Sequence, residues 1–357
     1  MPRPAKPSPV NMRTIAEQAG VHVSTVSRVL RRNSEAGEEN LSETARRVRE
    51  VARRLGYVPD PYASGLRSGQ SKVLGVLVPR LADVSLANMY EGIEAAVTAL
   101  GYHSIVATTR DDPEEQRRRL KLMINRRVDG LIVADASLEG GYVDELTACR
   151  LPFVLASRRY SDHLSVSCDD ELGGRLVGTH LVDLGHRDIA ITGGWPYTST
   201  GRDRIAGMLE AVRERGCDIP EERILLTGVT GPDGRRAAEQ LLALESPPTA
   251  IFALNDWAAI GVMGALRDHG LTPGKDVAVV GFNDISVSAD LPIPLSTVRN
   301  PMRTMGEVAG QMIVDHLEGR PVRSVRLQPR LVVRDSSDPR MGETRGDLGE
   351  SASATTG

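Results

Sequence analysis

The chain of 357 residues is poor in aromatic side chains and cysteines, and it has no long apolar run. Its three cysteines, Cys149, Cys168 and Cys217, are widely spaced and form no C-x-x-C pair, which indicates buried or free thiols in a reducing compartment. No apolar stretch is long enough to span a bilayer, and the polar, proline-rich first ten residues lack the apolar segment of a signal peptide. We therefore expect a cytoplasmic protein with no membrane partner.

Motifs of catalysis are also missing from the sequence. It contains no P-loop, no G-x-G-x-x-G, no nucleophile–base pair and no spacing typical of metal ligands. The acidic run from Asp169 to Glu171 lacks the histidines or glycines that would support a metal or acid–base site. We therefore expect no enzymatic activity, no metal and no cofactor.

Charge is distributed unevenly along the chain. Residues 1–72 contain 13 Lys/Arg and 7 Asp/Glu, whereas residues 73–357 contain 31 and 40, which together give the net charge of −3. A small basic module joined to a large acidic one is typical of a DNA-binding head on a ligand-binding body. A solvated charged helix at residues 43–54 would explain part of the same pattern.

Residues 10–57 show the apolar periodicity of a small helical domain. The spacing predicts a helix that ends at Ala19, a tight turn at Gly20, a second helix from near Val23, and a third helix with Ser42 as its N-cap. The side chains expected in one small core are Ile15, Ala16, Ala19, Val21, Val26, Val29, Leu30, Ala45, Val48, Val51, Ala52 and Leu55. The outer face of the second helix, which a major groove would read, then consists of Val23, Ser24, Ser27 and Arg28.

Two ordered motifs in this region carry a family resemblance. Residues 19–30 read AGVHVSTVSRVL, and Leu-Gly-Tyr-Val-Pro at residues 55–59 is followed by Ala63 and Leu66. The passage resembles the DNA-binding headpiece of the LacI/GalR family of bacterial transcription regulators. Two departures from the family pattern are the long acidic loop RRNSEAGEEN and His22, which stands where the family usually has serine, a better N-cap.

The resemblance assigns roles to individual residues of the head and hinge. Val23 and Ser24 occupy the positions of the main base-reading pair, Arg28 could pair bidentately with guanine, and Thr25 and Ser27 are placed for phosphates. Residues 58–72 resemble the hinge that forms a minor-groove helix on the operator. Leu66 matches the leucine that wedges between base pairs, the alternative being a residue that only packs the linker against the body.

Residues 73–335 alternate apolar strands with helices, which predicts parallel sheets covered by helices on both faces. Two such runs, divided near Asp169, indicate two doubly wound lobes whose ligands would lie beyond the C-terminal ends of the strands. The body resembles the effector domain of the same family, which is akin to periplasmic sugar-binding proteins. The expected fold is thus a small all-α helix-turn-helix head followed by an α/β effector domain of two parallel-sheet lobes. We expect residues 1–9 to form a disordered arm and residues 336–357 a disordered tail.

The resemblance also indicates residues that would bind the effector. Arg204 matches the family arginine that clamps effector hydroxyls or a charged group, although a surface ion pair is the alternative. Asn255 and Asn283 follow buried strands, and Asn283 replaces an aspartate common in the family. Asp169 lies at the crossover between lobes, and Asp256 and Asp284 are either ligands or helix caps. The family's aromatic wall after the first strand is replaced by Asp83–Leu86, which leaves Trp195, Tyr197 and Trp257 as stacking partners.

These observations predict a ligand-responsive transcription regulator, a repressor that binds a pseudo-palindromic double-stranded operator as a homodimer. The expected effector is a sugar, with a nucleoside or another polar metabolite as alternatives, and a tetramer is a further alternative to the dimer. A binding protein of transport type without DNA function is the second hypothesis, which the basic head and the missing signal peptide oppose.

Overall fold

The computed structural model describes residues 11–31, 41–57 and 70–338, and the chain divides into two compact units, residues 1–71 and 72–357. The expected arm, the 31–40 loop beyond Arg31, Leu66 with nearly all of the hinge, and most of the tail lie outside the described residues. Among the described residues, no helix is both long and apolar enough to cross a membrane.

The first unit is a three-helix domain. Its helices are α1 (Met12–Ala19), α2 (Val23–Arg31) and α3 (Glu43–Arg54). The Asn11 side chain caps α1, Gly20 ends it in the left-handed conformation with a φ of 63°, and Ser42 caps α3 as predicted. The predicted core is confirmed, because Ile15, Val26 and Val48 are fully buried together. These caps and turns are local, which explains why the sequence pattern places the helices correctly.

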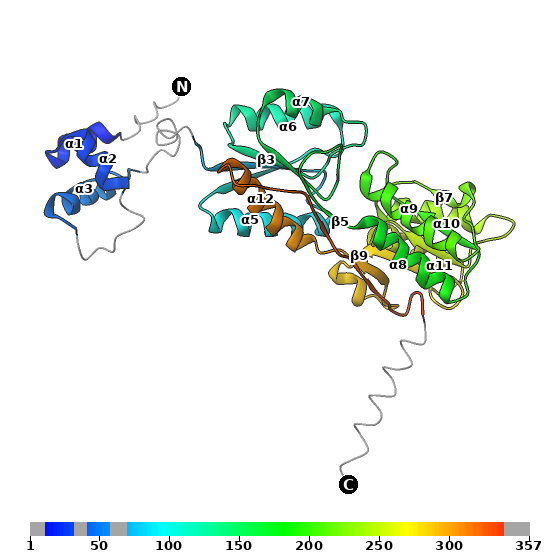
Figure 1. Cartoon of the computed structure of the whole chain (residues 1–357). Helices are drawn as coiled ribbons and strands as arrows, with labels where there is room; N and C mark the ends of the chain where they lie inside the picture. Colours follow the sequence, from blue (N-terminus) through cyan, green and yellow to red (C-terminus); the bar gives the residue numbers. More distant parts are fainter. Residues whose placement is uncertain (1–10, 32–40, 58–69, 339–357) are drawn as a thin grey trace, which may run out of the picture. The chain divides into compact units, whose positions relative to one another are not determined.

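The second unit contains two lobes, each built on one six-stranded sheet (Figure 1). The first sheet has the order β11-β5-β4-β3-β1-β2 and is parallel throughout. The second has the order β12-β10-β9-β8-β6-β7, with only β12 antiparallel to its neighbour. The strands are β1 (Val73–Val78), β2 (His103–Thr108), β3 (Gly130–Val133), β4 (Phe153–Ala156), β5 (Ser165–Cys168), β6 (Ile189–Thr192), β7 (Ile224–Leu225), β8 (Ala250–Ala253), β9 (Ala278–Asn283), β10 (Ser296–Arg299), β11 (Val325–Leu327) and β12 (Arg330–Val332).

Helices cover both faces of each sheet, which confirms the predicted doubly wound architecture. They are α5 (Val84–Ala99), α6 (Pro113–Asn125), α7 (Tyr142–Cys149), α8 (Asp170–Asp183), α9 (Ser199–Glu214), α10 (Gly231–Leu242), α11 (Asp256–Asp268) and α12 (Met302–Leu317), with short 3-10 turns at Glu221–Arg223 and Ser286–Ala289. The buried aliphatic strands pack between these layers, as the near-continuous apolar runs predict.

The chain crosses between the lobes three times, after β5, after β10 and after β11. The predicted division into two successive runs is therefore incomplete, because α12 and β11 return to the first lobe and β12 then rejoins the second. The predicted start of the tail at residue 336 is also wrong. Ser336 and Ser337 are buried, and the Ser336 hydroxyl donates to the carbonyl of Val279 at 2.6 Å.

Glycines allow two pairs of helices to pack in close contact. A Cβ on Gly92 of α5 would lie 2.1 Å from the carbonyl oxygen of Arg303 in α12, and a Cβ on Gly207 of α9 would lie 1.9 Å from that of Glu171 in α8. Any larger side chain at these two positions would push the helices apart. The close approach helps to fix the positions of α5, α9 and α12, whose first turns line the cavities described below.

Candidate DNA-binding face and effector cleft

The exposed face of α2 is the candidate DNA-binding surface of the first unit. Val23, Ser24 and Arg28 are exposed, and Thr25 is half-buried. The predicted outward position of Ser27 is wrong, since this residue is only 5% exposed. Ser27 lies one residue after Val26 and three before Leu30, so it falls at the edge of the stripe that packs into the core.

His22 begins α2 more effectively than its residue type indicated. Its Nδ1 accepts a hydrogen bond from the backbone amide of Ser24 at 3.2 Å and lies 2.8 Å from the Ser24 hydroxyl. The histidine therefore performs the capping role that serine performs elsewhere, with Nδ1 as the acceptor. The Ser24 hydroxyl, which was expected to read a base, is held against His22 in the free protein.

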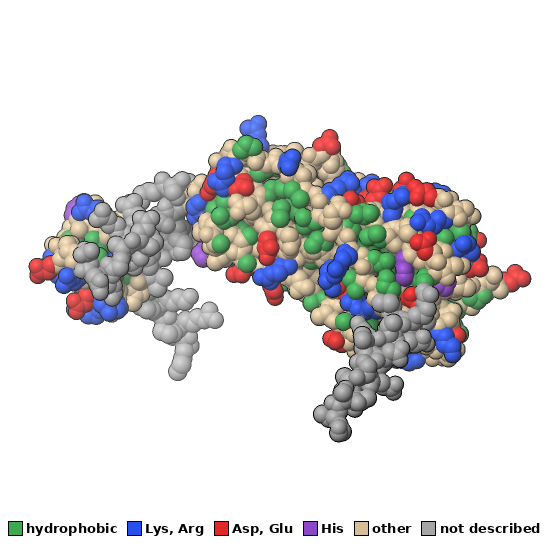
Figure 2. Space-filling model, turned by 60° about the horizontal axis from the view of Figure 1, so that its bottom comes forward, with side chains coloured by type: hydrophobic (Ala, Val, Ile, Leu, Met, Phe, Trp, Pro, Cys, Tyr) green, Lys and Arg blue, Asp and Glu red, His purple; other side chains and the backbone are tan. Residues whose placement is uncertain are grey.

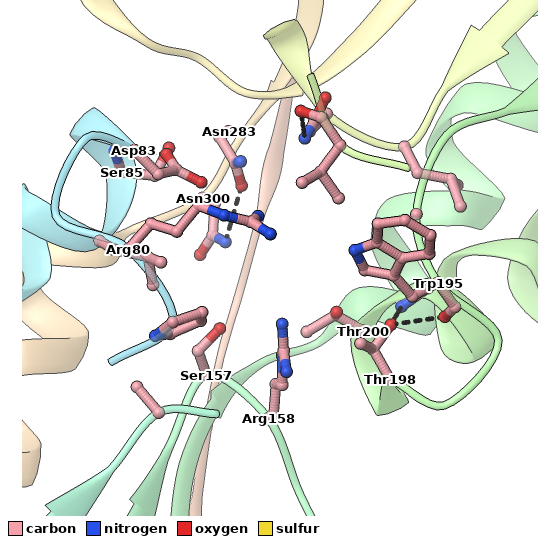
Figure 3. A pocket seen from close by; sticks show the side chains of 18 of the residues that line it. Arg80, Asp83, Ser85, Ser157, Arg158, Trp195, Thr198, Thr200, Asn283 and Asn300 are labelled. Carbon is pink, nitrogen blue, oxygen red and sulfur yellow. Dashed lines mark hydrogen bonds between the residues drawn. The ribbon is translucent and has the colours of Figure 1, made fainter. Parts of the chain in front are cut away.

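A polar cleft lies between the two lobes of the second unit, where the strands of both sheets end (Figure 3). Nine strands end at this cleft: β1, β2, β3, β4, β6, β7, β8, β9 and β10 are each followed within a few residues by a lining residue. The expected position of ligands, beyond the C-terminal ends of the strands, is thus confirmed for the cavity itself. The residues that line it with polar or charged side chains are Arg80, Asp83, Ser85, Asp111, Ser157, Arg158, Trp195, Thr198, Thr200, Arg204, Asn255, Asn283 and Asn300.

Three of these lining residues have strained backbones. Asp111, Ser157 and Asn283 have φ values of 57°, 66° and 116°, in the region that favours glycine. Each lies a few residues after a strand or at its end, where the chain turns along the cleft. Clusters of such conformations are typical of functional sites, because packing elsewhere must hold them in place.

Arg204 reaches the cleft from α9 and is held by three contacts. Its Nε donates to Asp170 Oδ1 at 2.8 Å, its Nη1 donates to the carbonyl of Leu254 at 2.6 Å, and its guanidinium stacks 3.5 Å over the ring of Phe282. Both members of the ion pair are buried, so the alternative of a surface ion pair is wrong. Nη2 has no hydrogen-bond acceptor among the described residues, so its N–H groups are available to donate to a ligand.

The two predicted asparagines also line the cleft, but both are partly engaged. Asn255 caps α11 by accepting from the amide of Ala258 at 2.7 Å, and its Nδ2 donates to the carbonyl of Val229 at 2.8 Å. Asn283 accepts from Nδ2 of Asn300 at 3.2 Å. These bonds fix the orientation of both side chains and leave each with unused hydrogen-bonding capacity.

Asp169 does not line the cleft, so its predicted place in the effector site is wrong. Its carboxylate caps α8 by accepting from the amide of Leu172 at 3.1 Å. Asp284 is held by Arg299 at 2.6 Å and by Arg334 at 2.7 Å. Both carboxylates are at crossover or strand-end positions and serve the fold.

Asp256 is fully buried beneath the cleft in the first turn of α11. Its carboxylate accepts from the amide of Ile285 at 2.8 Å and from the hydroxyl of Thr297 at 2.5 Å. Burial raises the pKa of Asp256 to about 6, although these hydrogen bonds oppose the shift. Asp256 is neither the N-cap of α11 nor a lining residue. Its buried hydrogen bonds join α11 to the segment after β9 and to β10.

Several lining residues, among them Arg80 and Arg158, were not identified from the sequence, whereas Trp195 was predicted as a stacking partner. Arg158 forms a bidentate ion pair with Asp111, at 2.6 and 3.1 Å, and points into the cleft together with Arg80 (Figure 3). Trp195 stacks on Tyr197 with ring centroids 6.1 Å apart, and its buried Nε1 has no hydrogen-bond partner among the described residues. The rule that selected Asn255 and Asn283, a polar residue directly after a buried strand, also selects Arg80, Ser157 and Arg158.

The face of the second unit that Figure 2 shows carries no patch of a single charge. Lys and Arg side chains are interspersed there with Asp and Glu.

A helix-turn-helix head and a two-lobed body with a polar cleft define the class of DNA-binding transcriptional regulators that respond to a ligand. Residues 11–60 match the family model "Bacterial regulatory proteins, lacI family", and residues 179–337 match the "Periplasmic binding protein-like domain". Catabolite control protein A of Priestia megaterium is 30% identical over 92% of this chain and 99% of its own length. The HTH-type transcriptional repressor PurR of Klebsiella pneumoniae (strain 342) is 29% identical over 91% of this chain and 96% of its own length.

Solved structures show the same relationship. The Lac repressor dimer bound to operator and the anti-inducer ONPF superposes with a TM-score of 0.83 at 27% identity, covering 93% of this chain and all of that chain. The complex of the transcriptional regulator CelR with cellobiose superposes with a TM-score of 0.70 at 26% identity, covering 92% of this chain and 99% of that chain. The chain belongs to the lacI family of bacterial regulatory proteins. It is a DNA-binding transcriptional regulator and not an enzyme, and nothing in the comparisons supports a transport-type binding protein.

Proposed function

We propose that the chain is a homodimeric repressor whose affinity for a pseudo-palindromic operator is set by a small polar effector bound in the cleft. The observation that carries the effector half of this proposal is the set of unused hydrogen-bonding groups that the cleft presents. Trp195 Nε1 and Arg204 Nη2 are donors without acceptors among the described residues, and Asn300 Oδ1 is a buried acceptor without a donor. A ligand with several hydroxyl groups matches a site that combines donors with acceptors.

A sugar is the effector class we favour. Two of the three lining arginines, Arg158 and Arg204, already have carboxylate partners, Asp111 and Asp170, which leaves only Arg80 without a carboxylate among the described residues and favours a neutral ligand over a strongly charged one. Trp195 adds an aromatic surface on which the apolar face of a sugar ring could stack. Cellobiose in the CelR complex is a ligand of this class, and a nucleoside remains the alternative because it also combines hydroxyl groups with a stacking ring.

The head supports sequence-specific binding through the exposed face of α2. We propose that Arg28 pairs bidentately with a guanine, that Val23 and Ser24 contact neighbouring bases, and that Thr25 contacts phosphate. To contact a base, the Ser24 hydroxyl would have to break its hydrogen bond with His22, or accept a hydrogen bond from the base while keeping it. One recognition helix makes too few base contacts for tight specific binding, so two heads on a dyad are needed, which favours the dimer.

The effector would act by changing the relative arrangement of the two lobes. A ligand held by Trp195 and Asn255 of the second lobe and by Arg80 and Arg158 of the first favours one lobe arrangement over others. Three chain crossings join the lobes, so this preference can be transmitted to the segment that precedes β1. A coupling of about 1–3 kcal/mol between the two sites would suffice for regulation. A protein with this function works on the bacterial nucleoid in the cytoplasm.

Fluorescence anisotropy with labelled duplexes tests the proposal. An operator would first be selected from a pool of randomised palindromic duplexes, and its affinity compared with that of a scrambled duplex at the same salt concentration. We expect the operator to bind at least about a thousandfold more tightly. Equal affinity for both duplexes, with and without a cleft ligand, would contradict the proposal.

A further inference from the structure

A second cavity lies beside the effector cleft, where two of the three crossings between the lobes pass. We call it the crossover pocket. It is lined by Ser85 and Asn88 of α5, by residues 283–285 at the end of β9, by residues 299–304 from the end of β10 into α12, and by Gln328 and Arg330. It shares Ser85, Asn283, Asn300 and Met302 with the cleft, so these side chains form the wall between the two cavities.

Two helix N-termini meet at the crossover pocket. Gly306 of α12 lies against Met89 and Ile93 of α5, and Gly310 lies further along against Ile93 and Ala96, so the two helices run in the same direction. Their first turns therefore lie at the same end, and the two helices lie side by side in Figure 1. Helix N-termini carry partial positive charge and favour anions. The N-terminus of α5 is already capped by the Asp83 carboxylate, which accepts from the amide of Ser85 at 3.0 Å, so the first turn of α12 is the one available to a ligand.

The first turn of α12 contains amide groups without a hydrogen-bond acceptor in the part of the chain that the structure describes. Its N-cap is Pro301, which has no side chain able to cap the helix. The amides of Arg303 and Thr304 have no hydrogen-bond acceptor among the described residues, and both residues line the pocket. Such orphan N–H groups are satisfied by water or by an anionic ligand.

A buried hydroxyl in the same wall points independently to a ligand. Ser85 is only 4% exposed, and its Oγ has no hydrogen-bond partner among the described residues. A buried hydroxyl without a partner is costly, and a bound oxyanion would accept its proton. Ser85, in the first turn of α5, lines both the crossover pocket and the effector cleft.

Arginines supply the remaining positive charge. Arg330 has no carboxylate within 4.0 Å among the described residues. Arg303 makes only exposed contacts at 3.3 Å, with Glu91 and Glu307, and such contacts are weak enough to be exchanged. Arg299 is paired with Asp284, which is also held by Arg334, so this carboxylate is already neutralised.

We propose that the crossover pocket is a binding site for an oxyanion of the phosphate class, separate from the effector site. The Ser85 hydroxyl, the amides of Arg303 and Thr304, and the guanidinium of Arg330 approach it from three segments of the chain. Donors from three separate segments suit a tetrahedral oxyanion, which presents acceptor oxygens on every side.

Thermal melting of the full chain in potassium phosphate tests the site, with potassium chloride at matched ionic strength as the reference. We expect a saturable rise in Tm that phosphate alone produces. Arg330→Gln and Ser85→Ala should each raise the half-saturating phosphate concentration by about tenfold or more. Ser85→Ala removes no hydrogen bond from the free protein, so it should fold normally.

Arg326→Gln is the matched control, because Arg326 is an exposed arginine four residues earlier that does not line the pocket. This variant should respond to phosphate as the wild type does. A rise in Tm that never saturates would overturn the proposal, since it would reflect general exclusion of phosphate from protein surfaces. The same response in wild type, Arg330→Gln and Ser85→Ala would overturn it as well, because phosphate would then bind elsewhere, for example on the head. Both outcomes leave the operator-binding test unaffected.

Discussion

Arg204 of α9 and Asp170 of α8 form a buried ion pair, with 2.8 Å between Nε and Oδ1. The pair lies at the contact where Gly207 lets the two helices approach closely. The carbonyl of Leu254 and the ring of Phe282 complete the setting of the guanidinium. The arginine is therefore held in place before any ligand arrives, which reduces the entropy lost on binding.

Loss of this arginine should destabilise the fold as well as the effector site. Arg204→Ala leaves Asp170 buried without its partner, and we expect it to lower the free energy of unfolding by about 3–5 kcal/mol. Urea unfolding at neutral pH measures the effect. Arg202→Ala, on the same helix with an exposed side chain, should cost about 0.5 kcal/mol or less. Equal stability of the two variants would show that the buried pair contributes nothing.

The indole of Trp195 should contribute to ligand affinity through its N–H group. Trp195→Phe keeps an aromatic ring but removes the donor, and we expect the affinity for a cleft ligand to fall by about 2–12-fold. The ligand would be found by a thermal-shift screen of sugars and nucleosides and its affinity measured by calorimetry. Nε1 has no partner among the described residues, so the variant loses no hydrogen bond, and any loss of stability should come only from the smaller ring beside Tyr197. Unchanged affinity would remove Trp195 from the site.

Arg28 should determine specificity rather than general DNA affinity. Arg28→Lys keeps the positive charge but loses the planar fork, so operator affinity should fall by about 1–3 kcal/mol while affinity for a scrambled duplex stays nearly constant. Anisotropy titrations on both duplexes measure this difference. A parallel loss on both would place Arg28 on the phosphate backbone instead.

Leu66 lies outside the described residues, and its wedge role remains a prediction. Leu66→Ala should weaken operator binding far more than binding to random DNA, because only the operator complex would contain the kinked base step. Competition titrations with both kinds of DNA separate the two effects. An equal loss on the two would favour the alternative, in which Leu66 only packs the linker.

Asp256 should titrate near pH 6, well above an ordinary aspartate. Its folded-state pKa is raised above the unfolded value of about 3.9, so the stability it contributes is present below pH 4 and is lost as the pH rises through 6. The loss is about 3 kcal/mol. The carbon-13 shift of the Asp256 carboxyl measures the midpoint, with Asp256→Asn to assign the signal. A midpoint at or below 4 would contradict the role of burial.

The head and the alternation of strands and helices in each run could be predicted because they depend on local signals. Asn11, Gly20 and Ser42 act within four residues of their partners, and short apolar runs mark the buried strands. The return of α12 to the first lobe could not be predicted, because it depends on glycine contacts with α5 more than 200 residues away. Asp169 was misplaced for the same reason: its residue type fits a ligand or a cap, and only the three-dimensional arrangement distinguishes the two.

The coupling between cleft and operator is the central claim, and its most direct test is the operator Kd measured with and without a saturating cleft ligand. We predict a change of about 5–150-fold, and an equal change in ligand affinity when operator is present, as linkage requires. A ligand that binds in the cleft, is weakened by Trp195→Phe, and leaves the operator Kd unchanged would contradict the account.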